Sequence, residues 1–163
     1  MAERELSYAD AAKEAIQLAM RKDPSVIIMG EDIAGAAGRA DQGFLDAWGG
    51  PFAITRGLIG EFGPERVRDT PISEAGFIGA AVGAAATGLR PIADLMFVDF
   101  IGVCLDPFLN TAAKVPYMFG GQTRLPVTVT TKIGAGSGSG ATHSTTLYSI
   151  FTHIPGLKCV APS

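Results

Sequence analysis

The stretch VRDTPISEAGFIGAAVGAAATGLRPIADLMF, residues 67–97, decides the fold. It begins with a brief apolar and charged strand, continues through a helix from Glu74 to Thr87, and ends in a strand from Arg90 to Phe97. A strand, a helix and a strand in this order predict two parallel strands joined by a right-handed crossover.

The sequence on either side of this stretch repeats the alternation of helix and strand. Ser7 to Asp10 forms a capping box, after which small and apolar residues mark one helical face as far as Pro24. The run Val26 to Met29 is apolar throughout, which is typical of a strand covered on both faces. We therefore predict an α/β fold, a parallel sheet with helices on both faces. The other expected elements are a glycine-rich segment over 35–50, a helix over 51–62, a helix over 99–117 interrupted at Pro107, a strand over 126–132, a flexible loop over 133–140, a short helix over 144–152 and a last strand over 157–161.

Length and composition bound the class of protein. A chain of 163 residues that is 47% hydrophobic and 18% charged is expected to form one compact domain. Its long uncharged stretch, residues 75–89, is shorter than the roughly 20 residues that cross a bilayer, so no membrane span is predicted. The N-terminus has no basic segment followed by an apolar core, and we expect a cytoplasmic protein.

Charge and cysteine content exclude further classes. All sixteen Asp and Glu residues lie at or before Asp106, and the four Lys and Arg residues that follow are scattered, which argues against nucleic-acid binding. Cys104 and Cys159 stand far apart, a pattern that favours reduced core thiols over a disulfide framework or a zinc site. No metal-ligand spacing surrounds His143 or His153.

Common nucleotide and hydrolase motifs are absent from the sequence. There is no GxxxxGK[ST] loop. The segment Gly136 to Ala141 satisfies GxGxxA, but no acidic residue follows it to bind the ribose of a dinucleotide. Ser137 and Ser139 are out of register with a GxSxG nucleophile elbow.

In a parallel sheet, ligands bind in the loops beyond the carboxyl ends of the strands. These loops contain Glu31, Asp32, Glu74, residues 97–100 and residues 134–143. Glu74 follows a candidate cap, Ser73, so its simplest explanation is that it complements the positive end of its helix. The helix behind it has small residues along one face, which allow close approach of another helix or a cofactor: Gly76, Gly79 or Ala80, Gly83 and Thr87.

Five motifs, in unbroken order, resemble the β subunit of the thiamine-diphosphate-dependent, decarboxylating component of 2-oxo acid dehydrogenase complexes. They are Asp23-Pro-Ser-Val-Ile-Ile-Met-Gly-Glu-Asp32, Asp69-Thr-Pro-Ile-Ser-Glu74, Gly88-Leu-Arg-Pro-Ile92, Tyr117-Met-Phe-Gly-Gly121 and His153-Ile-Pro-Gly-Leu157. Within that family, the segments most similar to acetoin dehydrogenase are Asp46-Ala-Trp-Gly-Gly50, Leu95-Met-Phe-Val-Asp-Phe100 with Gly102-Val-Cys104, and Phe151-Thr-His-Ile-Pro155.

The resemblance implies a transketolase-like pyrimidine-binding domain and a role for each candidate residue. Glu74 matches the glutamate that hydrogen-bonds the aminopyrimidine and promotes the imino tautomer that removes the thiazolium C2 proton. Phe100 matches the aromatic residue that lies against the aminopyrimidine, and Met96 a neighbouring pocket residue. His143 matches the active-site histidine near the substrate. Taken alone, Met96 and Phe100 are ordinary core residues and His143 a surface residue; the family also often has glutamine on both sides of that histidine segment, where this chain has threonine.

The resemblance also implies partners. Thiamine diphosphate would be shared with an α subunit, which holds Mg²⁺ through a Gly-Asp-Gly motif that this chain lacks. A second β subunit and a lipoyl acyltransferase core complete the expected assembly. Residues 1–163 are expected to be the pyrimidine-binding domain, incomplete at its C-terminus and without the family's C-terminal domain.

Three functions remain open from the sequence. The first is half of an active site that cleaves acetoin or a 2-oxo acid and passes the acyl group to a lipoyl carrier, inactive as an isolated chain. The second is a non-catalytic assembly or binding module of the same fold. The third is a fragment of a transketolase-like synthase.

Overall fold

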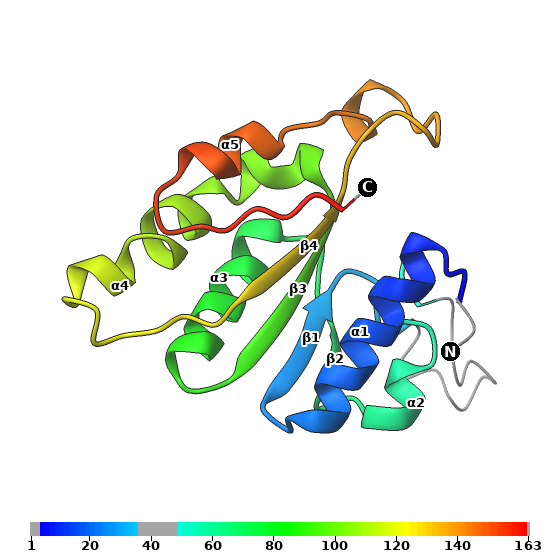
Figure 1. Ribbon diagram of the computed structural model, residues 1–163, viewed down its shortest axis with the longest axis horizontal. Coiled ribbons are helices and arrows are strands. Elements are labelled where there is room, and N and C mark those ends of the chain that lie inside the picture. The colour runs from blue at the N-terminus through cyan, green and yellow to red at the C-terminus, as the bar shows by residue number, and fades with distance from the viewer. Residues whose placement is uncertain (1–3, 36–48, 163) are drawn as a thin grey trace.

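The computed structural model describes residues 4–35 and 49–162, and its centre is a four-stranded parallel sheet (Figure 1). The strands are β1 (Val26–Gly30), β2 (Val67–Asp69), β3 (Arg90–Phe97) and β4 (Thr128–Lys132), in the order β2-β1-β3-β4. All three strand pairings are parallel. The two strands predicted from residues 67–97 are therefore parallel, as expected, and lie on either side of β1.

Helices cover both faces of the sheet, as the sequence predicted (Figure 1). Helix α3 (Glu74–Ala86) packs on one face, where Ile27 and Met29 of β1 join its buried residues. Helices α1 (Tyr8–Lys22) and α2 (Leu58–Phe62) pack on the other, against Val26 and Ile28. Because successive side chains of a strand point to opposite faces, both halves of this apolar run are buried.

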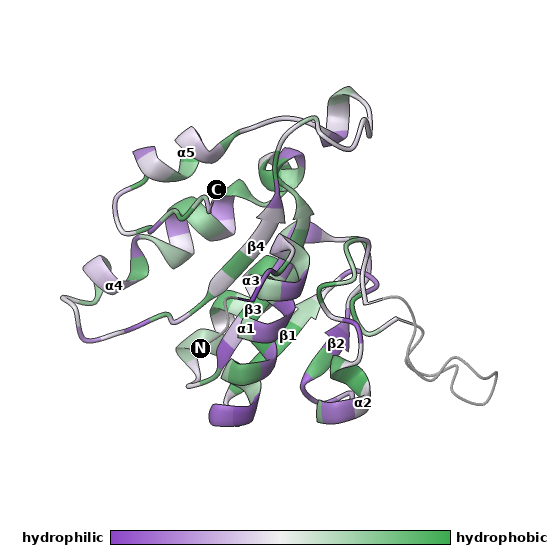
Figure 2. Cartoon of the chain, turned by 45° about the vertical axis from the view of Figure 1, so that its right-hand side comes forward, coloured by the Kyte–Doolittle hydropathy of each residue, from purple (hydrophilic) through white to green (hydrophobic). Residues whose placement is uncertain are grey.

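Helix α1 begins at the predicted capping box. The Asp10 N–H donates to Ser7 Oγ at 3.1 Å, and the Ser7 hydroxyl donates to the Asp10 carboxylate at 2.6 Å. The helix buries Ile16 and Met20 against the sheet. Hydrophilic residues alternate with hydrophobic ones along α1 in Figure 2, whereas β1 is hydrophobic throughout, as their different burial requires.

Three predicted helices are shorter than expected. Only α2 forms within 51–62, because Ala53 and Gly57 have φ angles of 58° and 84°, which a continuous right-handed helix does not allow. The predicted helix over 99–117 is divided, because proline interrupts helical hydrogen bonding at Pro107 and Pro116. It becomes the 3-10 helix η2 (Val98–Val103), the π-helix η3 (Pro107–Ala112) and α4 (Val115–Met118). The helix predicted over 144–152 becomes α5 (Tyr148–His153), preceded by the 3-10 helix η4 (Ala141–His143).

Two other predictions have different outcomes. The expected last strand over 157–161 is wrong: these residues form no strand and are mostly exposed. A strand needs a neighbour to satisfy its backbone hydrogen bonds, and residues 157–161 pair with none. The predicted glycine-rich segment over 35–50 lies mostly outside the described residues.

Within 4–35 and 49–162, no helix is long and apolar enough to span a membrane.

Candidate functional site

The parallel register brings the carboxyl ends of the four strands to one edge of the sheet. At this edge β1 continues into Glu31, β2 ends at Asp69, β3 ends at Phe97 and β4 ends at Lys132. The carboxyl groups of Glu31, Asp32 and Glu74 lie close enough at this edge to affect one another. Burial, followed by the charges of Asp32 and Glu74, raises the pKa of Glu31 above its ordinary value. The predicted loops therefore share one edge of the molecule.

Glu74 begins α3 immediately after the loop that follows β2. The loop is tied to the sheet because the Thr70 N–H donates to the Gly30 carbonyl at 3.0 Å. Glu74 is half-buried. Ser73 occupies the predicted N-cap position, but its hydroxyl makes no capping hydrogen bond. The described residues of this chain thus leave the Glu74 carboxylate partly open to solvent.

Cys104 connects Glu74 with the next part of the site. Burial, and then the charge of Glu74, raise the pKa of the Cys104 thiol to about 11. Its Sγ donates to the Phe100 carbonyl at 3.6 Å. Cys104 is a free, buried core thiol as predicted, whereas Cys159 is free but exposed, so the prediction of a core position is wrong for Cys159.

A bulge at the end of β3 sets the position of Met96. The pairing with β4 shifts register between Asp94 and Phe97, and Met96 has a φ of 69°, which is rare for a residue with a side chain. The Asp94 carboxylate holds this conformation by accepting the Met96 N–H at 3.0 Å and the Thr130 hydroxyl at 3.4 Å. Burial is the main reason that the pKa of Asp94 is raised. Backbone strain of this kind is concentrated at functional sites.

Phe97 is the centre of an aromatic cluster formed by Phe52, Phe97, Phe100 and His143. The ring centroid of Phe97 lies 5.1 Å from that of Phe52, 5.8 Å from that of Phe100 and 4.7 Å from that of His143, all edge to face. Phe100 and His143 also contact each other at 5.3 Å. The structure therefore brings together two of the predicted site residues, Phe100 and His143, which are distant in sequence.

Sequence reasoning placed Phe97 in a ligand-binding loop but missed Phe52 and Lys132 at this site. Lys132 Nζ lies 4.8 Å from the ring centroid of Phe52 and 5.6 Å from that of Phe97, and it donates to Ser137 Oγ at 2.8 Å. A cation over aromatic faces is electrostatically stabilised by the ring quadrupoles. The available signal was that Lys132 stands at the carboxyl end of the β-branched strand over 126–132, where a ligand-binding loop is expected.

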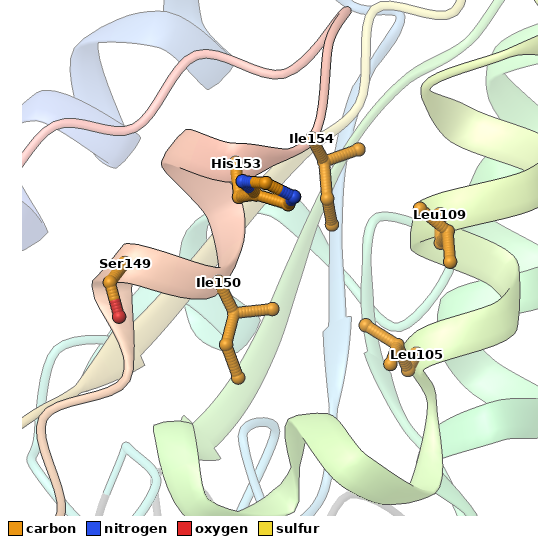
Figure 3. Close-up of a pocket in the computed structure, with 6 residues that line it drawn as sticks. All are labelled: Leu105, Leu109, Ser149, Ile150, His153 and Ile154. Atoms are coloured by element: carbon orange, nitrogen blue, oxygen red, sulfur yellow. The ribbon is translucent and has the colours of Figure 1, made fainter.

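A separate hollow lies between α5 and the segment 105–112 (Figure 3). It has a volume of about 430 Å³. Its lining is mainly apolar and contains none of the predicted site residues. The lining residues are Leu105, Leu109, Ser149, Ile150, His153 and Ile154. In the part of the chain that the structure describes, no group of three His, Cys, Asp or Glu side chains is arranged to hold a metal ion.

Comparison with protein families gives a match over residues 4–163 to the transketolase pyrimidine-binding domain. The chain belongs to this family. A solved structure described as a split gene transketolase, inactive beta4 tetramer, shares the fold of this pyrimidine-binding domain with a TM-score of 0.60. That match has 18% sequence identity and covers 89% of this chain and 39% of the other.

Similar proteins carry names of oxidoreductase and dehydrogenase β subunits. This pyrimidine-binding domain is 56% identical to the acetoin:2,6-dichlorophenolindophenol oxidoreductase subunit beta of Bacillus subtilis, covering 98% of this chain and 47% of the relative. The subunit of the same name from Cupriavidus necator is 55% identical over 98% of this chain and 46% of its own length. The pyruvate dehydrogenase E1 component subunit beta of Rickettsia bellii is 41% identical over 97% of this chain and 45% of its own length. The chain spans about half the length of these relatives.

The small-residue face of the pyrimidine-binding domain points away from its own core. Residues Phe77, Ile78 and Val82 of α3 are buried, whereas Gly83 and Thr87 are exposed. A Cβ atom added at Gly79 or Gly83 would meet nothing within 4 Å. The described residues of this chain therefore do not explain why this face is small.

Proposed function

We propose that this chain supplies the aminopyrimidine half of a thiamine-diphosphate site in a dehydrogenase that cleaves acetoin or a 2-oxo acid. The observation that supports this most strongly is the half-buried Glu74 carboxylate at the carboxyl edge of a transketolase-type sheet. The names of the relatives that are 55% or more identical favour acetoin. When bound, the cofactor supplies a carbon nucleophile for cleavage of the bond beside a carbonyl group.

The chemistry of the side chains at this edge fits an aminopyrimidine ring. Glu74 offers a carboxyl group that can exchange a proton with a ring nitrogen at hydrogen-bond distance. Phe100, which is half-buried, offers an aromatic face, and Met96 offers a polarisable side chain that adapts to a flat ring. The strained bulge fixes the backbone of Met96 before any ligand binds.

His143 would act at the substrate end of the same site. Its ring lies against Phe97 and Phe100, and its Nδ1 is 2.9 Å from the Thr142 hydroxyl. An imidazole can donate or accept a proton near neutral pH, as cleavage of a carbon bond next to a carbonyl requires. We assign His143 to proton transfer or contact with the substrate, and Glu74 to the cofactor ring.

The partly open position of Glu74 points to a partner. The aminopyrimidine ring nitrogen is a weak base. Proton exchange between it and a carboxyl group is efficient only where water is excluded. We propose that an α subunit closes the site, holds the diphosphate through Mg²⁺, and forms with this chain a twofold assembly that contains a second β subunit. Acyl transfer to the lipoyl acyltransferase core belongs to that assembly.

Calorimetry tests this division of the site between two chains. We expect no measurable binding of thiamine diphosphate and Mg²⁺ to this chain alone, and saturable binding after an α subunit is added, because each chain holds only part of the ligand. Tight binding to the isolated chain contradicts a shared site. Absence of binding in the presence of the partner contradicts the catalytic proposal and favours the non-catalytic assembly module.

The small-residue face of α3 is expected to be a close contact in the assembly. Gly83→Leu should weaken association by about tenfold or more, because a leucine side chain prevents close approach of the partner. The fold should tolerate it: the position is open and helical, and replacing glycine gains roughly 0.5–1 kcal/mol. Sedimentation velocity of the mixed subunits measures the effect, and Gly60→Leu, another open helical glycine, is the matched control. Native association of Gly83→Leu contradicts this role.

A further inference from the structure

We propose that Asp99 is a positioning residue that holds His143 against Phe97 and Phe100 by binding the backbone just after the histidine. This inference deepens the function proposed above, since it explains how a histidine in a glycine-rich loop is kept at the site. Nothing in the motifs that resemble known proteins assigns a role to Asp99.

Asp99 lies between the two rings that His143 contacts. It is in η2, one residue before Phe100 and two after Phe97, and it is half-buried. Its Oδ1 accepts the Thr145 N–H at 3.3 Å, a contact between residues 46 positions apart. Thr145 follows His143 by two residues, so the carboxylate anchors the loop next to the imidazole.

Thr145 is held from both sides of its peptide backbone. Its N–H donates to Asp99, and its carbonyl accepts the Gly134 N–H at 2.8 Å. The bond from Gly134 joins the two ends of the loop 134–145. The bond to Asp99 fastens that closed loop to η2, next to Phe97 and Phe100 in the chain.

The electrostatics of Asp99 agree with this contact. Desolvation acts to raise the pKa of its carboxyl, but hydrogen bonding from the loop residues Thr145 and Ser144 leaves it below its ordinary value. Asp99 takes part in none of the ion pairs among the described residues. The loop therefore binds the carboxylate through Oδ1, and none of these ion pairs supplies a basic side chain to it.

Two buried atoms at this contact could form a further hydrogen bond. Asp99 Oδ2 and Thr145 Oγ1 are both buried and have no hydrogen-bond partner among the described residues. A buried acceptor and a buried donor without partners are each unfavourable, and a small rotation that pairs them would strengthen the anchor.

The loop needs an anchor because its own sequence does not order it. Gly134, Gly138 and Gly140 all have positive φ angles, and residues 135–142 are exposed. Fixing such a segment opposes its large conformational entropy. Edge-to-face ring contacts alone are worth little and leave the imidazole free to move away.

Nuclear magnetic resonance of the chain tests this role without cofactor or activity. The chain has two histidines, so the imidazole signals of His143 can be compared with those of His153 on α5. In the native chain, we expect cross-relaxation between His143 and the ring protons of Phe97 and Phe100. Asp99→Ala should abolish it and speed hydrogen exchange of the Thr145 amide by about tenfold or more, the size expected for loss of a hydrogen bond to a charged group.

Asp99→Asn keeps an acceptor oxygen and the size of the side chain, so it should show a smaller increase in exchange and retain part of the ring contacts. Asp106→Ala is the matched control, because Asp106 is exposed and its carboxylate accepts only a local hydrogen bond from Asn110 at 2.6 Å. The proposal is overturned if His143 keeps its ring contacts in both Asp99 variants, or if His153 shifts as much as His143. Neither result bears on whether Glu74 serves the cofactor.

Discussion

Glu74→Gln is expected to slow exchange of the C2 proton of thiamine diphosphate by about 10²–10⁴-fold in the complex with an α subunit. A glutamine amide can still form a hydrogen bond to a ring nitrogen, but it cannot exchange a proton with it. Cofactor affinity should therefore change far less than the exchange rate. Deuterium exchange at C2, followed by nuclear magnetic resonance after rapid acid quench, separates the two effects.

The fold should be indifferent to this change. Glu74 is half-buried at the first position of α3, and the lost charge at the helix N-terminus is worth roughly 0.3–1 kcal/mol. The control is Glu65→Gln, which removes an exposed carboxylate that pairs only with Arg68, three residues along. An exchange rate in Glu74→Gln equal to that of Glu65→Gln would show that Glu74 is not the residue that activates the cofactor.

Gly30→Ala is expected to lower the free energy of unfolding by about 1–3 kcal/mol, the usual effect of overfilling a packed position. Gly30 is the last residue of β1 and pairs with Asp94 of β3. A Cβ atom there would lie 2.8 Å from the Asp94 carbonyl oxygen and 3.1 Å from its Cβ. Backbone cannot move aside as a flexible side chain can, so the strand pairing must shift.

The change in strand pairing should also alter the bulge at the candidate site, because the Asp94 carboxylate accepts the Met96 N–H there. Urea unfolding followed by circular dichroism measures the loss of stability, and the Met96 methyl resonance reports the bulge. Gly79→Ala is the matched control: its Cβ has open space, and removing a helical glycine should raise stability by roughly 0.5–1 kcal/mol. If Gly30→Ala is as stable as the native chain, the close approach of β1 and β3 described above is incorrect.

Much of the sheet was predictable because its signals are local. The strand over 90–97 was predicted with its observed bounds, and the run over 26–29 showed burial on both faces, which the structure confirms. The failures lie where local signals conflict with backbone geometry. Residues 51–57 have helix-like composition, yet Ala53 and Gly57 adopt positive φ angles. The apolar run over 157–161 resembles a strand but has no neighbour to pair with.

The candidate site was only partly visible in the sequence. Glu74, Met96, Phe100 and His143 were identified by matching motifs, and that Phe100 and His143 touch became apparent only in the structure. Asp99 was predicted to start a helix and lay within the expected ligand loop 97–100, but no role could be assigned to it because its partner Thr145 is 46 positions away.

The sequence by itself predicted the alternation of strands and helices over most of the chain, the parallel sheet and the loops expected to bind a ligand, since the periodicity of apolar residues reports burial segment by segment. Only the tertiary structure decided the bulge that turns Met96, the ring cluster around Phe97 and the anchor between Asp99 and Thr145. These features depend on strand register and on the path of a flexible loop. Both are set by packing between segments that are distant in sequence, and the residues of one segment do not indicate which other segment they will contact.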